Sequence, residues 1–178
     1  MLLVALLLAA GPAGQLLELQ QGTLTYTLVH KLHEVKGTTK QLEGKALLPS
    51  DGGPARVQVR TRVATFESGN GSRDEHMREV THEALHPYAS VKGSLTGATW
   101  PLTAPADAVL HATVELNGEK REQDVPVKLL PLDGGGVRTT FSFPLSLEGF
   151  KIERPELLFV KVDDKLVIDG ELVFGAPR

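Results

Sequence analysis

Two histidines and a glutamate near the middle of the chain have the spacing of a zinc site. His82, Glu83 and His86 form the pattern H-E-x-x-H, in which two histidines four residues apart on a helix bind zinc and the glutamate acts as a base. Pro87 follows directly, and a proline pushes the residue before it out of the helical region, so His86 is expected to leave the face of His82. Ala89 also stands where a metzincin has glycine. A metal-dependent hydrolase using these three residues is therefore an alternative and not the favoured function.

A second pair of histidines, His30 and His33, lies closer to the N-terminus. In a strand, residues three apart point to opposite faces, so this pair does not converge on one ion. His30 continues the face of Leu24, Tyr26 and Leu28 and is expected to point inward. An inward polar group needs a partner, which would be another core group or the polar head of a ligand.

The remaining reactive side chains lack the surroundings of an active site. Ser68 and Ser72 have no G-x-S-x-G context, and Gly134 to Gly136 are not followed by the helix and lysine of a phosphate loop. The chain has no cysteine, which excludes disulfides, thiolate metal sites and cysteine nucleophiles. Its 19 basic and 22 acidic residues are mixed along the sequence, unlike a nucleic-acid-binding surface. We therefore expect no catalytic residue, no metal ligand and no cofactor, and a protein that is not an enzyme.

The elements that would position these residues are mostly strands. Apolar and polar residues alternate with period two, which means that one face is buried and the other is solvated. Asn117-Gly118 is a strong hairpin signal, and Asp163-Asp164-Lys165 is expected to join the last two strands by a tight turn. About eight or nine such strands predict an all-β barrel, whose closure removes exposed edges. The alternating segments are 23–28, 56–65, 108–116, 125–129, 137–148, 157–162 and 166–174.

One segment, residues 72–85, breaks this alternation and is predicted to be a short helix. Ser72 with Glu75 three residues later fits a capping box, and Pro87 should end the helix. One face carries apolar residues at helical spacing: Met77, Val80 and Ala84.

The N-terminus reads as an export signal. Residues 1–10 are apolar throughout, a run shorter than the roughly 20 residues that cross a bilayer, and small residues follow at 11–14. We expect residues 1–14 to be a signal peptide and residues 15–178 to form one domain in the periplasm or outside the cell. No later segment is apolar enough for stable membrane insertion.

The helix and its surroundings resemble the YceI-like family. A strand leads into Arg73-Asp74-Glu75-His76-Met77, a helix follows, and His86-Pro87-Tyr88 begins a new strand. Upstream, residues 28–37 resemble the family's early histidine-containing segment, which ends in a turn glycine. Downstream, residues 114–118 resemble its Leu-x-Leu-His-Gly step, with Asn117 in the place of the usual histidine. The resemblance spans nearly the whole mature chain.

This resemblance implies an eight-stranded antiparallel lipocalin-like barrel with one inserted helix. Family members are typically periplasmic carriers of polyisoprenoid lipids or related amphiphiles and usually pair as dimers. We therefore expect a carrier for an isoprenoid lipid or quinone, and a homodimer. A barrel of eight strands is just wide enough to be filled or to hold one small ligand. A filled barrel that acts through its outer surface in a stress response is the other alternative.

The candidate ligand-binding residues are those expected to point into the barrel. Such pockets combine an apolar wall with a few polar groups, and His30 and Arg73 are the predicted polar contacts. The predicted wall consists of Tyr26, Leu28, Val59, Val63, Met77, Val80, Phe141, Phe143 and Leu145.

Overall fold

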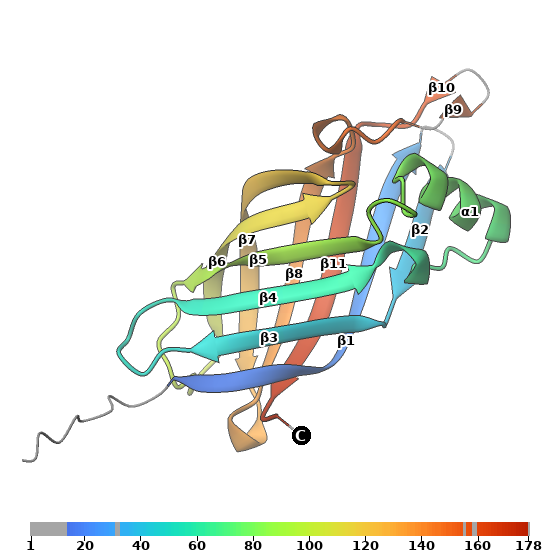
Figure 1. The fold of residues 1–178 in the computed structure, drawn as a ribbon. Helices are drawn as coiled ribbons and strands as arrows, with labels where there is room; N and C mark the ends of the chain where they lie inside the picture. The colour runs from blue at the N-terminus through green and yellow to red at the C-terminus, as the bar shows by residue number, and fades with distance from the viewer. Residues whose placement is uncertain (1–13, 31–32, 155, 158–159, 178) are drawn as a thin grey trace, which may run out of the picture.

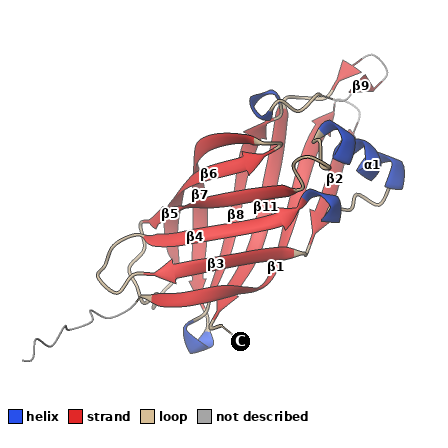
Figure 2. Ribbon diagram, viewed as in Figure 1, coloured by secondary structure: helices blue, strands red, loops and turns tan. Residues whose placement is uncertain are grey.

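The computed structural model describes residues 14–30, 33–154, 156–157 and 160–177 (Figures 1 and 2). The predicted signal peptide thus lies, except for Gly14, outside the described residues. Within the described ranges, no helix is long and apolar enough to cross a membrane. The strands are β1 (Gln15–His30), β2 (His33–Thr39), β3 (Leu42–Leu48), β4 (Ala55–Arg62), β5 (Tyr88–Thr96), β6 (Ala106–Leu116), β7 (Glu119–Pro131), β8 (Val137–Ser146), β9 (Glu156–Leu157), β10 (Val160–Lys161) and β11 (Lys165–Gly175). The helices are α1 (Gly71–Val80) and the 3-10 turns η1 (Val63–Thr65), η2 (Asp133–Gly135) and η3 (Glu148–Phe150).

The main sheet closes on itself because β1 pairs with β11 as well as with β2 and β3. The sheet order is β11-β8-β7-β6-β5-β4-β3-β1-β2, and every pairing is antiparallel. β2 lies beside one half of β1 and β3 beside the other, so the two occupy one position in the wall. The described chain is therefore a closed antiparallel barrel of eight strands with one α-helix, as the sequence predicted.

The hairpin expected through Asp163-Asp164-Lys165 is wrong. β9 and β10 pair with each other, and β11 instead lies between β8 and β1. Asp164 fastens the end of β8, since its carboxylate accepts hydrogen bonds from Ser146 Oγ at 2.6 Å and from the Glu148 backbone N–H at 2.7 Å. The strand predicted over residues 56–65 is also shorter than expected, because Val63–Thr65 form η1.

Helix α1 is shorter than the predicted 72–85. Its cap is Asn70 and not Ser72, because Asn70 Oδ1 accepts a hydrogen bond from the Arg73 backbone N–H at 3.1 Å. The helix ends at Val80, and residues 81–85 form turns. His82 has φ 47°, and a residue in this left-handed region ends a helix well before Pro87 could do so.

A single buried amide, that of Asn117, joins the end of α1 to the barrel. Asn117 begins the two-residue turn between β6 and β7 with φ 52°, a conformation that asparagine tolerates better than most residues. Its Oδ1 accepts a hydrogen bond from His82 Nδ1 at 2.9 Å. Its Nδ2 donates to the backbone oxygens of Phe150 at 2.9 Å and Lys151 at 3.2 Å. Three segments that are distant in sequence therefore meet at one side chain.

We predict that Asn117→Ala lowers the free energy of unfolding by about 2 to 3 kcal/mol, because it leaves buried hydrogen-bonding groups without partners. His82→Gly is the milder variant, because it removes only one of these hydrogen bonds and glycine adopts φ 47° without strain. We expect it to lower the free energy of unfolding by about 1 kcal/mol. Urea unfolding of the two variants measures the difference. Equal losses in both variants would contradict this role of the amide.

A second prediction concerns the contribution of Asp164 to the stability of the fold at low pH. Burial would raise the pKa of Asp164, but the hydrogen bonds from Glu148 N–H and Ser146 Oγ, with Arg154 nearby, outweigh it and hold the pKa below its ordinary value. A lowered pKa stabilises the fold above the pKa of an unfolded aspartate, about 3.9, and this stabilisation is lost as pH falls through the folded value. Asp164→Asn should therefore lower the melting temperature at pH 7 and cost progressively less below about pH 4. Thermal melts from pH 7 to pH 2.5 test this prediction, and Asp163→Asn, at an exposed neighbouring residue, is the control. A difference in melting temperature between Asp164→Asn and the parent that did not change with pH would refute it.

Candidate functional site

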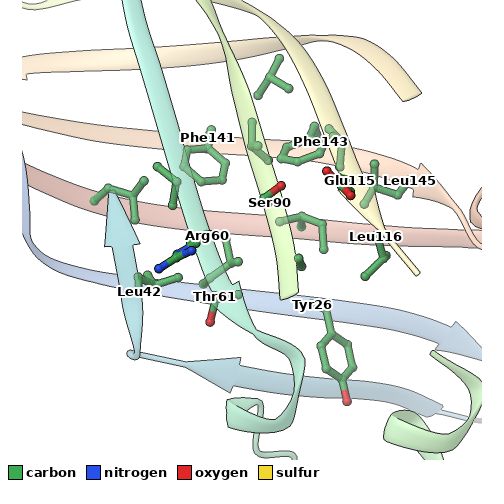
Figure 3. A pocket seen from close by; sticks show the side chains of 18 of the residues that line it. Tyr26, Leu42, Arg60, Thr61, Ser90, Glu115, Leu116, Phe141, Phe143 and Leu145 are labelled. Carbon is green, nitrogen blue, oxygen red and sulfur yellow. The ribbon is translucent and has the colours of Figure 1, made fainter. Parts of the chain in front are cut away.

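The interior of the barrel is open. It contains a cavity of about 260 Å³, bordered by residues of β1 to β8, β11 and α1 (Figure 3). Many inward positions carry small side chains, such as Ala46, Ala55 and Val91, and aromatic residues make up only 5% of the chain. Side chains can fill a barrel of eight strands. Here they are too small to do so, and the space just approaches the roughly 300 Å³ at which pockets for small molecules begin.

Two aromatic side chains lie flat against the wall because a glycine stands opposite each. Tyr26 in β1 pairs with Gly37 in β2, and Phe141 in β8 pairs with Gly170 in β11. A Cβ atom on either glycine would clash with the facing ring. The rings therefore cover the backbone of the neighbouring strand and leave the centre of the barrel free.

All the predicted site residues except His30 line this cavity, so the structure brings them together as expected. His30 is the last residue of β1, but its side chain lies outside the described residues. That these residues bind a ligand stays a prediction. Phe141 and Phe143 contact each other, with ring centroids 6.0 Å apart. The cavity-lining members of the predicted set are Tyr26, Leu28, Val59, Val63, Arg73, Met77, Val80, Phe141, Phe143 and Leu145.

Helix α1 covers one end of the barrel (Figure 1). It contributes Arg73, His76, Met77 and Val80 to the cavity wall. The helix is held in place by the buried carboxylate of Asp74, which accepts hydrogen bonds from the Ser68 backbone N–H at 3.0 and 3.2 Å. Asp74 of the Arg-Asp-x-His-Met block thus fastens the first turn of α1 to the loop that precedes it.

Tyr26 is the polar aromatic group at this end. Its ring packs against Phe66 with centroids 5.5 Å apart, and Figure 3 shows its hydroxyl pointing away from the other labelled residues. Burial raises the pKa of Tyr26 above its ordinary value, and the charge of Asp74 acts in the same direction, while Arg73 opposes them. The hydroxyl therefore stays neutral over the physiological pH range.

Several residues that line the cavity are absent from the set predicted from the sequence. Ile168, Leu172 and Phe174 alternate along β11 and also face the cavity. Their period-two pattern was visible, but the strand was assigned to a local hairpin. Trp100 borders the cavity from the loop between β5 and β6, and nothing in a loop sequence indicates that direction. His76 belongs to the Arg-Asp-x-His-Met block and could have been included.

The H-E-x-x-H residues do not form the geometry that zinc binding on a helix requires. His82 lies beyond the end of α1, where its Nδ1 is hydrogen bonded to Asn117, and His86 lies after the turn in the irregular stretch before β5. In the ranges that the structure describes, no three His, Asp or Glu side chains gather as a metal-binding group would. This segment therefore acts in the described structure as a connection between α1 and the barrel.

Comparison with known proteins agrees with this architecture. The model of the YceI-like domain matches residues 17–174. Among solved structures, BcnA of Burkholderia cenocepacia is similar with a TM-score of 0.71 and 15% identity, over 85% of this chain and 95% of that one. A polyisoprenoid binding domain from Saccharophagus degradans, implicated in plant cell wall breakdown, gives a TM-score of 0.66 and 15% identity, over 90% and 98%.

A third structure, the YCEI protein of Campylobacter jejuni, gives a TM-score of 0.64 and 11% identity, over 84% of this chain and 90% of that one. A search of the curated proteins found no match. At these identities the solved structures support the fold, while the domain model covers nearly the whole described chain. The chain therefore belongs to the YceI-like family.

Proposed function

We propose that this protein binds and carries a long apolar ligand, such as an isoprenoid lipid or a quinone, in the periplasm or outside the cell. The observation that carries the proposal is the open cavity, whose wall is built almost entirely from aliphatic and aromatic side chains. Export rests on the apolar N-terminal sequence. Pairing as a homodimer, which belongs to the same proposal, rests on the resemblance to the family.

The apolar wall of the cavity favours the tail of an amphiphilic ligand over its head. Each buried methylene contributes about 0.8 kcal/mol, so a tail of about ten carbons gains about 8 kcal/mol before the cost of association is subtracted. A charged or strongly polar head would lose its hydration in this space, where few of the lining side chains could replace it. The ligand therefore enters with its tail, and its head stays near the surface.

The comparisons support a binding role more than a catalytic one. The Saccharophagus degradans domain is described as polyisoprenoid binding, and it has the same fold. The alternative of a hydrolase would need His82 and His86 on one helix face, which they do not share. The alternative of a filled barrel would need side chains in the space that the cavity occupies.

We predict that filling the cavity abolishes binding. Val91 in β5 faces the interior, between its ladder partners Val59 and Val114, which line the cavity as well. Val91→Phe should weaken binding of farnesol or of a short-chain quinone at least tenfold, because the larger ring occupies the space of the tail. The measurement is displacement of the fluorescent apolar probe N-phenyl-1-naphthylamine.

The control places the same ring on the other face of the same strand. Lys92 is exposed, so Lys92→Phe should bind like the parent protein. Circular dichroism verifies that both variants are folded. The proposal would be wrong if the parent bound none of these ligands, or if Val91→Phe bound them as well as Lys92→Phe did.

A further inference from the structure

A second hollow, of about 220 Å³, lies beside the end of the β3–β4 ladder. Its wall includes Arg60, Arg62 and Tyr88. The guanidinium carbon of Arg60 is 5.0 Å from the centroid of the Tyr88 ring, and that of Arg62 is 5.9 Å from it. Two cations thus share one aromatic ring on the exposed surface, which keeps both guanidinium groups close together.

The backbone ladder on the other side of β3 is interrupted beside this hollow. The ladder between β1 and β2 ends at the pair Leu24–Thr39. The ladder between β1 and β3 ends at the pair Glu18–Lys45. Within the described strands, no such pair links residues 19–23 to residues 40–44. β1 also changes register against β11 between Leu19 and Gln21. We call this interrupted part of the wall, residues 19–23 and 40–44, the seam.

Next to the seam, an isolated backbone bridge between Thr38 and Glu67 joins β2 to the segment after η1, and side-chain hydroxyl groups close the wedge between that bridge and the β3–β4 ladder. The ladder between β3 and β4 begins at Leu42 and Thr61, and β4 then turns into η1. The hydroxyl groups of Thr39 and Thr65 are hydrogen bonded at 2.8 Å. Thr61 Oγ1 donates to the backbone oxygen of Gln41 at 2.7 Å. Hydroxyl contacts of this kind separate more easily than a continuous backbone ladder.

The outer hollow and the barrel cavity are neighbours across this wedge. Leu42, Arg60 and Thr61 border both spaces. Figure 3 shows these three on one side of the cavity, away from Phe143 and Leu145. The apolar interior and the cationic surface therefore adjoin at the end of the β3–β4 ladder, where Leu42 pairs with Thr61. Helix α1 lies in the connection between β4 and β5 at this same end of the barrel, where Asp74 and Asn117 hold the covering segments by hydrogen bonds.

The charge of the hollow favours an anion. Glu43 holds Arg60, with its Oε2 2.6 Å from Nη2 and 2.8 Å from Nε. The Glu43 side chain is 68% exposed, so an anion can compete with it for the guanidinium. Two arginines and one glutamate leave one net positive charge. Guanidinium groups bind phosphate and carboxylate oxygens in pairs of parallel hydrogen bonds.

We propose that Arg60 and Arg62 bind the anionic head group, a phosphate or carboxylate, of an amphiphile whose tail passes the seam at Leu42 and occupies the barrel. This inference rests on the proposed function and adds to it the class of the ligand and the side of the barrel on which its head lies. Tyr88 positions the two arginines, and the apolar cavity excludes the head.

The test compares two ligands with the same tail. Dodecyl phosphate and 1-dodecanol, both below their critical micelle concentrations, each displace N-phenyl-1-naphthylamine from the purified full chain at low ionic strength. The parent protein should prefer dodecyl phosphate. The double variant Arg60→Gln/Arg62→Gln should lose roughly fivefold or more in affinity for dodecyl phosphate and much less in affinity for dodecanol, and Arg62→Gln alone, whose side chain does not border the cavity, should show the same selectivity.

Two further variants sharpen the result. Arg56→Gln removes a cation from the same strand and the same outer face, but outside the hollow, and should keep the preference. Glu43→Gln removes the competing carboxylate and should strengthen binding of dodecyl phosphate. Added salt should weaken dodecyl phosphate and leave dodecanol unaffected, because an exposed charge contact is screened.

Three outcomes would overturn the inference. The double variant could keep the full preference for dodecyl phosphate, or Arg56→Gln could reduce it as strongly as the double variant does. The preference could instead vanish in Arg73→Gln alone, which would place the head group beside α1 and inside the cavity wall. Failure of dodecanol to displace the probe from the parent protein would overturn the proposed function itself.

Discussion

Closure of the sheet between β1 and β11 is the interaction on which the rest of the structure depends. The ladder runs from Glu18 and Gly175 to Leu28 and Leu166, and it turns an open sheet into a barrel with an inside and an outside. Once the barrel is closed, period-two alternation sends every second side chain inward. Small aliphatic residues at many of these positions leave the centre unfilled. The same closure therefore produces both the stability of the wall and the space for a ligand.

The pairing of β1 with its neighbours in the closed sheet is irregular near its N-terminal half. β1 pairs with β11 from Glu18 to Leu28, and the register of this ladder shifts between Leu19 and Gln21, as at a β-bulge. On the other side of β1, the partner strand is broken into β2 and β3 at the same level. The seam therefore lies where pairing is irregular on both sides of β1. α1 lies in the connection between β4 and β5, and the Asp74 carboxylate holds its first turn to the preceding loop.

Local patterns in the sequence were sufficient for the class of fold and for much of the cavity wall. Val59, Phe143 and Leu145 were assigned inward from alternation alone, since burial of one face is a property of each strand by itself. The partner of β11 could not be found this way, because pairing with β1 joins opposite ends of the chain. Asn70 and Ser72 are both plausible caps in sequence, and only the fold selects Asn70. The left-handed His82 and the inward Trp100 depend on contacts with distant segments.

The central claim is that the barrel holds one apolar molecule in a space that its own side chains leave open. Native mass spectrometry of the protein, purified under mild conditions from cells that export it, tests this claim most directly. The account predicts the mass of the polypeptide plus a single apolar molecule, which organic extraction removes and which a lipid extract of the same cells restores. Detection of the bare polypeptide before extraction, and again after incubation with the extract, would contradict it.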